Sequence, residues 1–165
     1  MTETIGDNGF VENKIADLKK RLSDYENNVG IRTREDNKSA EQYLVLTKEQ
    51  LQKMTAEECG YIAYELVQFS IHVQKNINKE LAIVNFCREN IKRTIANDLP
   101  QIKAYHFEEK KMLAIRHNSH ADILHKIEIQ AQARVDTLSF ITDKIKLLVE
   151  VLKNIQYTKK GTKYE

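Results

Sequence analysis

The stretch NDLP, from Asn97 to Pro100, decides how this chain of 165 residues is expected to fold. Proline fixes its own backbone angle, lacks an N–H to donate, and disfavours helix in the residue before it. No other proline occurs in the sequence. Because helix-forming segments lie on both sides, this stretch predicts a turn between two long helices.

The segment before the break has an unbroken helical period. Between Thr55 and Asn97 the only glycine is Gly60. Two capping-box patterns, Thr47 with Gln50 and Thr55 with Glu58, predict helix starts ahead of the period. Apolar residues then recur about every 3.7 residues, at Ile62, Leu66, Phe69, Val73, Ile77, Leu81, Val84, Cys87, Ile91 and Ile95.

The segment after the break contains neither glycine nor proline from about residue 105 to residue 157. Its apolar residues recur at close to 3.5 residues, the period of a coiled-coil seam, at Leu124, Ile127, Ala131, Val135, Leu138, Ile141, Ile145, Leu148, Leu152 and Ile155. The sequence therefore predicts an all-α fold. Its core is a long antiparallel helical hairpin over residues 47–157, with one continuous helix after the turn.

A shorter heptad pattern precedes the hairpin. Gly9 and Gly30 bracket a three-heptad seam made of Val11, Ile15, Leu18, Leu22, Tyr25 and Val29. We expect an additional heptad helix within residues 1–30, a polar linker over residues 31–46 and a basic flexible tail over residues 158–165.

Residues 61–73, YIAYELVQFSIHV, are apolar on both faces of a helix. A membrane span needs about 20 apolar residues, so the run is too short for one. Tyr61, Tyr64, Val67 and Ile71 occupy the face turned away from the seam, and leaving each in water forgoes about 1.5–3 kcal/mol. The pattern predicts a homo-oligomer held together at these four residues and along the second seam, at Leu138, Ile141, Ile145, Leu148, Leu152 and Ile155.

Composition argues against an enzyme. Charged residues make up 30% of the chain and tryptophan is absent, which is typical of helices with solvated faces. No nucleophile elbow, phosphate-binding glycine loop or paired-carboxylate motif is visible, so we expect neither catalysis nor a cofactor. His117, His120 and His125 cannot all face one ion on a helix, and no metal site is predicted.

Localisation is expected to be cytoplasmic. No signal-peptide pattern opens the sequence, and Cys59 and Cys87 lack the spacing of a metal site or a disulfide framework.

Positive charge is concentrated in the second part of the chain. Residues 1–60 carry nine Lys and Arg against twelve Asp and Glu, whereas residues 61–165 carry seventeen against twelve. A hairpin would gather cations and aromatic rings near its turn, which suits phosphates and unpaired bases of a single strand. The candidate nucleic-acid-binding residues are Lys75, Lys79, Phe86, Arg88, Lys92, Arg93, Lys103, Tyr105, Phe107, Lys110 and Lys111. The alternative is a solvated face, diluted by Glu108 and Glu109, with aromatic rings that only pack the turn.

The layout of residues 60–157 resembles the UvsY family of recombination mediators from T-even-type phages. An apolar patch precedes KNINKELAIVNFCRENIKRTI, and a short interruption leads into HNSHADILHKIEIQAQARVDTLSFITDKIKLLVEVLKNIQ. The resemblance implies a non-enzymatic, ring-like oligomer that binds single-stranded DNA. It would help load the phage recombinase onto strands covered by single-strand-binding protein.

Only some functional residues of the family have counterparts in this sequence. Arg88, Lys92 and Arg93 stand where the family has its DNA-contacting motif, and oligomerisation through the C-terminal helix maps onto residues 138–155. The N-terminal heptad segment and the ending TKKGTKYE depart from the family pattern. The alternative function is a helical structural or assembly protein, such as a virion or scaffold component, that binds only protein partners.

Overall fold

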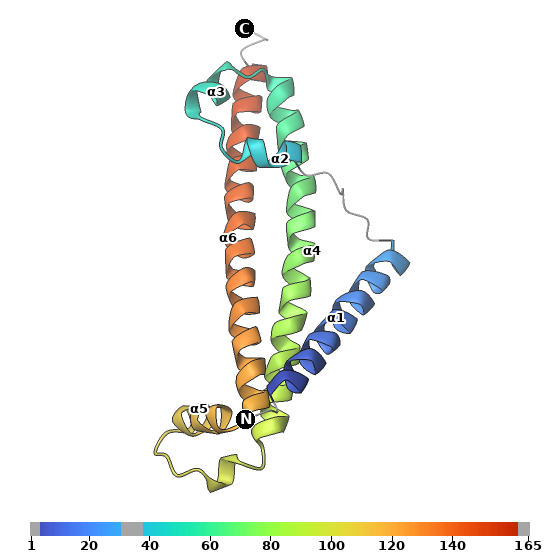
Figure 1. Cartoon of the computed structure of the whole chain (residues 1–165). Coiled ribbons are helices and arrows are strands. Elements are labelled where there is room, and N and C mark those ends of the chain that lie inside the picture. The colour runs from blue at the N-terminus through green and yellow to red at the C-terminus, as the bar shows by residue number, and fades with distance from the viewer. Residues whose placement is uncertain (1–3, 31–37, 162–165) are drawn as a thin grey trace. The chain divides into compact units, whose positions relative to one another are not determined.

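The computed structural model describes residues 4–30 and 38–161, which form helices and connecting turns without a β-strand. The all-α prediction is confirmed. No helix within these ranges is both long and apolar enough to cross a membrane. In chain order the elements are α1 (Thr4–Asn28), α2 (Lys38–Tyr43), α3 (Lys48–Lys53), α4 (Ala56–Ile95), the 3-10 helix η1 (Leu99–Gln101), α5 (Phe107–His117) and α6 (Ser119–Gly161) (Figure 1).

Both predicted capping boxes form. At α3, the Gln50 N–H donates to the Thr47 hydroxyl at 3.3 Å, and the Thr47 N–H donates to the Gln50 side chain at 2.8 Å. At α4, Thr55 and Glu58 make the same reciprocal pair at 3.2 and 2.7 Å. These bonds satisfy N–H groups that the first turn of a helix leaves free, and both helix starts are where the sequence predicts them.

Replacing Thr55 by alanine is expected to lower the free energy of unfolding by about 1 kcal/mol, because the hydroxyl cap is lost. The Thr55 N–H and then its hydroxyl lower the pKa of the Glu58 carboxyl from its ordinary 4.5, and alanine removes only the hydroxyl. A lowered pKa stabilises the fold above the ordinary value and ceases to do so as the pH falls through the lowered one. The deficit should therefore shrink in acid.

Thermal unfolding near neutral pH and at acid pH measures this effect. Thr55→Ser, which keeps a hydroxyl, is the matched control and should unfold close to wild type. A Thr55→Ala variant as stable as wild type at neutral pH would show that the cap contributes nothing.

The chain breaks at Pro100 as predicted. Helix α4 ends at Ile95, five residues before the proline, and η1 carries Pro100 inside its first turn. The peptide after η1 is extended at Ile102, with φ −85° and ψ 124°. The two long helical segments are therefore separate elements.

A second break, at Asn118, was not predicted. Its backbone is extended, at φ −113° and ψ 110°, and it divides the expected single helix into α5 and α6. The Asn118 side chain accepts a hydrogen bond from the Ala121 N–H at 3.1 Å, so it caps the start of α6. Figure 1 shows that α5 crosses the end of α6 instead of continuing its axis.

The chain divides into two compact units, with the C-terminal half of α4 and the N-terminal part of α6 in the first. The described residues of this first unit are 4–30 and 78–136. Its core is formed by α1, α4, α5 and α6 through Val11, Ile83, Val84, Cys87, Ile91, Ile95, Ala114, Ile115, Ala121, Leu124 and Ala131.

Ion pairs connect the helices of the first unit. Arg88 Nε lies 2.7 Å from Glu128 of α6, and Arg134 lies 2.8 Å from Glu80 of α4. Lys79 of α4 reaches Glu26 of α1 at 3.4 Å. These pairs link residues far apart in the sequence.

Helix α1 differs from its prediction at both ends. It begins at Thr4 and runs through Gly9, which therefore does not bracket it. Val11 is buried in the core and Ile15 and Leu18 pack against it, whereas Tyr25 and Val29 are exposed. Burial of the seam therefore decreases along α1, although Lys79 of α4 still contacts Ser23 and Glu26 in its second half.

The described residues of the second unit are 38–77 and 137–161. Its buried side chains on α4 include Ile62, Leu66 and Val73, and those on α6 include Ile145 and Leu152. Gly60 permits a close approach, since a Cβ there would lie 2.7 Å from the Gln156 side-chain nitrogen. Lys159 of α6 donates to the backbone oxygens of Gln52 and Met54, at the end of α3.

The segments before residue 47 and after residue 157 are more helical than predicted. The expected linker, residues 31–46, contains α2, and the expected flexible tail is helical as far as Gly161. Residues 31–37 and 162–165 lie outside the described residues.

The outer face of α4 in the second unit is apolar and exposed, as the sequence predicts. Tyr61, Tyr64, Val67 and Ile71 expose 57, 58, 40 and 45% of their surface. The prediction for α6 needs correction. Ile145 and Leu152 are 1 and 0% exposed, because they pack inside this one chain, and Leu138, Ile141, Leu148 and Ile155 are partly buried. The side chains that α6 leaves exposed in this unit include Phe140, Leu147 and Val151.

Candidate nucleic-acid interface

A small pocket in the first unit gathers several of the predicted cations. It has a volume of about 150 Å³ and lies between α4, α5 and α6. Its walls are formed by Arg88, Ile91, Lys92, Lys111, Met112, Ile115, His125 and Glu128. We call it the α4–α5–α6 pocket.

The turn at Asn118 explains how α5 contributes to this pocket. Because α5 is a separate helix, its residues at positions 111, 112 and 115 share one face and turn toward α4 and α6. In the predicted continuous helix, these residues would have followed the axis of α6. The pocket therefore depends on a break that the sequence analysis did not place.

Arg88 is held by partners inside the protein. Its Nε donates to Glu128 at 2.7 Å, and its Nη2 donates to the Gln132 side chain at 3.2 Å. Glu128 also lies 3.4 Å from His125 Nδ1. Arg88 was predicted to bind phosphate, and we correct this role: its principal contacts connect α4 to α6.

Among residues 4–30 and 38–161, Lys92 and Lys111 form ion pairs only with neighbours on their own helices. Lys92 lies 2.7 Å from Glu89, and Lys111 lies 3.7 Å from Glu108, each pair three residues apart on one helix. Their side chains are 67 and 38% exposed. Exposed pairs of this kind contribute little to stability, so both ammonium groups can exchange a carboxylate for a phosphate at small cost.

The remaining predicted cations at this end do not line the same pocket. Lys103 lies beside an open hollow of about 510 Å³ that also involves Asp98, Gln101, Ile102, Leu113 and His117. Leu113 and His117 lie on the opposite side of α5 from Lys111 and Ile115. The expected basic tip is therefore divided by α5 into two surfaces. Arg93 and Lys110 belong to the same unit and line neither of these two hollows.

The three aromatic residues predicted to stack on bases differ in how exposed their rings are. Tyr105 is fully exposed and Phe107 is largely exposed, so both can stack on a base. Phe86, in contrast, is partly buried and packs against the core of the unit. The prediction that Phe86 offers a stacking surface is wrong for this reason.

Two further predicted cations do not line this pocket. Lys79 donates to Ser23 at 3.1 Å and pairs with Glu26, so it holds α1 onto α4. Lys75 belongs to the second unit. The candidate interface is therefore reduced to Lys92, Arg93, Lys103, Tyr105, Phe107, Lys110 and Lys111.

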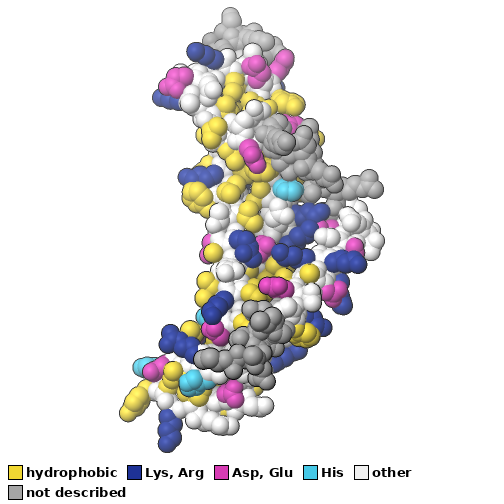
Figure 2. All heavy atoms as spheres, viewed as in Figure 1, with side chains coloured by type: hydrophobic (Ala, Val, Ile, Leu, Met, Phe, Trp, Pro, Cys, Tyr) yellow, Lys and Arg dark blue, Asp and Glu magenta, His cyan; other side chains and the backbone are white. Residues whose placement is uncertain are grey.

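The sequence analysis missed several residues of the pocket. His125 and Glu128 supply its polar wall, while Ile91, Met112 and Ile115 supply apolar surface. Asn118 was the available signal, because asparagine is a favoured N-cap and would have separated α5 from α6. Figure 2 shows Lys and Arg interspersed with carboxylates over the visible face, so charge density alone does not mark a site.

Cys87, next to the pocket, is a packing residue. Burial raises the pKa of its thiol to about 11, and the Glu128 carboxylate adds to this effect. A thiol with this pKa stays protonated at neutral pH and is a poor nucleophile there. Among the described residues, no group of three or more His, Cys, Asp and Glu side chains could hold a metal ion.

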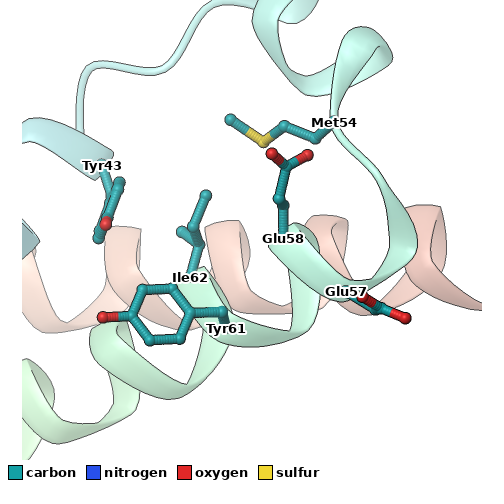
Figure 3. A pocket seen from close by; sticks show the side chains of 6 residues that line it. All are labelled: Tyr43, Met54, Glu57, Glu58, Tyr61 and Ile62. Atoms are coloured by element: carbon teal, nitrogen blue, oxygen red, sulfur yellow. The ribbon is translucent and has the colours of Figure 1, made fainter.

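A different pocket lies in the second unit, with a volume of about 450 Å³. Figure 3 shows the rings of Tyr43 and Tyr61 toward one end, Met54 and Glu58 toward the other, and Ile62 between them. Glu57 also belongs to its lining. With two carboxylates and no cation in that lining, this pocket disfavours phosphate and does not belong to the nucleic-acid interface.

Comparison with known proteins gave no match: no family model, curated protein or solved structure is significantly similar to this chain.

Proposed function

We propose that the protein is a non-enzymatic, oligomeric mediator that binds single-stranded DNA and helps load a recombinase onto it during phage recombination and repair. It would act in the cytoplasm of the host cell, without a cofactor. The DNA-binding part rests on the α4–α5–α6 pocket and its surroundings. The recombinase and the single-strand-binding protein as partners rest on the resemblance of residues 60–157 to the UvsY family.

The single observation that carries DNA binding is the presence of weakly held cations and exposed rings in one unit. Within the part of the chain that the structure describes, Lys92 and Lys111 pair only with neighbouring carboxylates, and Tyr105 and Phe107 are exposed in the same unit. Cations for the backbone and rings for unpaired bases are what binding of single strands without sequence preference requires.

Helices α4 and α6 are proposed to form one antiparallel hairpin. In the first unit Glu80 pairs with Arg134 and Arg88 pairs with Glu128. In the second unit Gly60 faces Gln156. Residue numbers on α6 fall as those on α4 rise, and the two numbers of each pair add up to nearly the same total in both units, which supports a continuous antiparallel pairing.

A second copy is proposed to cover the apolar outer face of α4. From Tyr61 to Ile71 this face extends about 15 Å, and the exposed stripe of α6 from Phe140 to Val151 extends about 16 Å. Between its ends the α6 stripe carries Lys144 and Lys146 against Asp143 and Glu150, so charge does not oppose the contact. The matching length favours packing of the α6 stripe of one copy on the α4 stripe of another.

The alternative is an assembly protein that binds only other proteins. The exposed α4 and α6 stripes favour it, since they offer apolar surface that no DNA strand would use. This alternative leaves Lys92, Lys111 and the two exposed rings without a ligand.

A Lys92→Ala/Arg93→Ala variant tests DNA binding. Its affinity for a labelled single-stranded oligonucleotide is expected to fall. The slope of log K against log salt should become shallower by about 1.4, since each lost phosphate contact removes about 0.7. Fluorescence anisotropy over a range of salt concentrations measures both quantities.

The matched control is Lys153→Ala/Lys160→Ala, which removes the same charge from exposed positions on α6 in the second unit, beyond the stripe from Phe140 to Val151. It should bind DNA as wild type does. If Lys92→Ala/Arg93→Ala kept its helicity and the wild-type slope, the interface would be misassigned. If wild type bound no single strand at low salt, the assembly function would replace the mediator function.

A further inference from the structure

We propose that the α4–α5–α6 pocket receives one unpaired base of the bound strand, while Lys92 and Lys111 at its rim hold the adjoining phosphates. This inference rests on the proposed function and deepens it. It assigns the interior of the pocket to a flat heterocycle and not to a phosphate.

The lining supplies apolar surface that a base can cover. Ile91 and Ile115 are almost fully buried in the core and present only their edges to the pocket, and Met112 is partly buried. A thioether makes favourable contacts with an aromatic ring. A flat ring in this hollow would cover the exposed part of Met112 and the small edges of Ile91 and Ile115, and removing this apolar surface from water is favourable.

The size of the pocket suits one small group. At about 30 Å³ for each water, its 150 Å³ holds about five water molecules. Pockets for drug-sized ligands measure about 300–1,000 Å³, so this one admits a single ring system and excludes a folded peptide segment.

The polar wall distinguishes a base from a phosphate. Glu128 lies in the wall with one carboxylate oxygen 2.7 Å from Arg88 Nε and the other 3.4 Å from His125, so a phosphate that bound Arg88 inside the pocket would first have to displace this carboxylate. The edge of a base instead needs both donors and acceptors. Arg88 and His125 can donate and Glu128 can accept, so the wall offers both.

The contacts of Arg88 keep this wall in place. Glu128 and Gln132 use two of the five N–H donors of its guanidinium group, and the others remain for a base. The phosphates of the strand would then bind Lys92 and Lys111, whose side chains are exposed to solvent. Paired bases in a duplex are stacked and cannot enter, which gives preference for single strands a physical cause.

The test compares two strands of equal length and charge under the same salt concentration. One is entirely abasic, and the other carries a single thymine in an otherwise abasic strand. Wild type should bind the thymine strand about 5- to 100-fold more tightly, the range expected for one stacked base. A Tyr105→Ala/Phe107→Ala variant should keep this preference, because it retains the pocket.

Met112→Trp should abolish the preference by filling the pocket, while affinity for the abasic strand stays unchanged because every cation remains. Circular dichroism checks that the variant folds.

If wild type bound both strands equally and with a steep salt dependence, the base pocket would be wrong and the proposed DNA-binding function would stand. If the preference disappeared in Tyr105→Ala/Phe107→Ala and survived in Met112→Trp, the exposed rings would hold the base. If wild type bound neither these strands nor ordinary single-stranded DNA, the proposed function would fail together with this inference.

Discussion

Lysine at both Tyr64 and Ile71 is expected to reduce self-association by about tenfold to a hundredfold. Both side chains lie on the exposed face of α4 that a second copy is proposed to cover, and they are 58 and 45% exposed. Fully burying such a side chain contributes about 1.5–3 kcal/mol, so covering the exposed half of each contributes about half of that. The loss of both is therefore about 1.5–3 kcal/mol, and every 1.4 kcal/mol corresponds to a factor of ten in association. Two added charges at the interface can only increase the loss.

Light scattering of wild type and variant over a range of protein concentrations measures this effect. Tyr25→Lys/Ile129→Lys is the matched control, since it makes the same two changes at exposed positions in the first unit. The control should associate as wild type does. A single well-folded chain for wild type in dilute, low-salt buffer would refute the oligomer directly.

Leu66→Ala is expected to lower the free energy of unfolding by about 2–5 kcal/mol. Leu66 is fully buried in the second unit, and truncation leaves a cavity as well as losing apolar contact. For a chain of this length each kcal/mol lowers the melting temperature by about 2–4 °C, so the variant should melt about 5–20 °C below wild type.

Leu81→Ala makes the same substitution where the side chain is more than one-third exposed. Its loss should be clearly smaller, because less apolar surface is buried and solvent can fill the space left behind. Thermal unfolding followed by circular dichroism compares the two. Equal losses would mean that Leu66 does not lie in a core.

Much of the secondary structure was predictable because it depends on neighbours in the sequence. The two capping boxes join residues three apart, and Pro100 interrupts a helix through its own ring. The apolar outer face of α4 also follows from helical period alone. These features were identified correctly for that reason.

The candidate interface was predictable only in part. Whether a cation is free to bind phosphate depends on whether it already contacts a side chain far away in the sequence. From the sequence alone, Arg88 and Lys79 cannot be distinguished from Lys92, because all three are cations within the same helical segment. Yet Arg88 meets Glu128 forty residues away, and Lys79 meets Ser23 fifty-six residues away. A helical wheel contains no information about such partners.

The sequence by itself determined the helical class of this protein, the starts of α3 and α4, the break at Pro100 and the unusual apolar face of residues 61–73. The tertiary structure decided which cations stay available, that Ile145 and Leu152 are buried within one chain, and that α5 turns at Asn118 to build a pocket. The division has a physical reason. Caps, turns and helical period arise from interactions within about four residues, whereas burial and charge pairing depend on which helices meet.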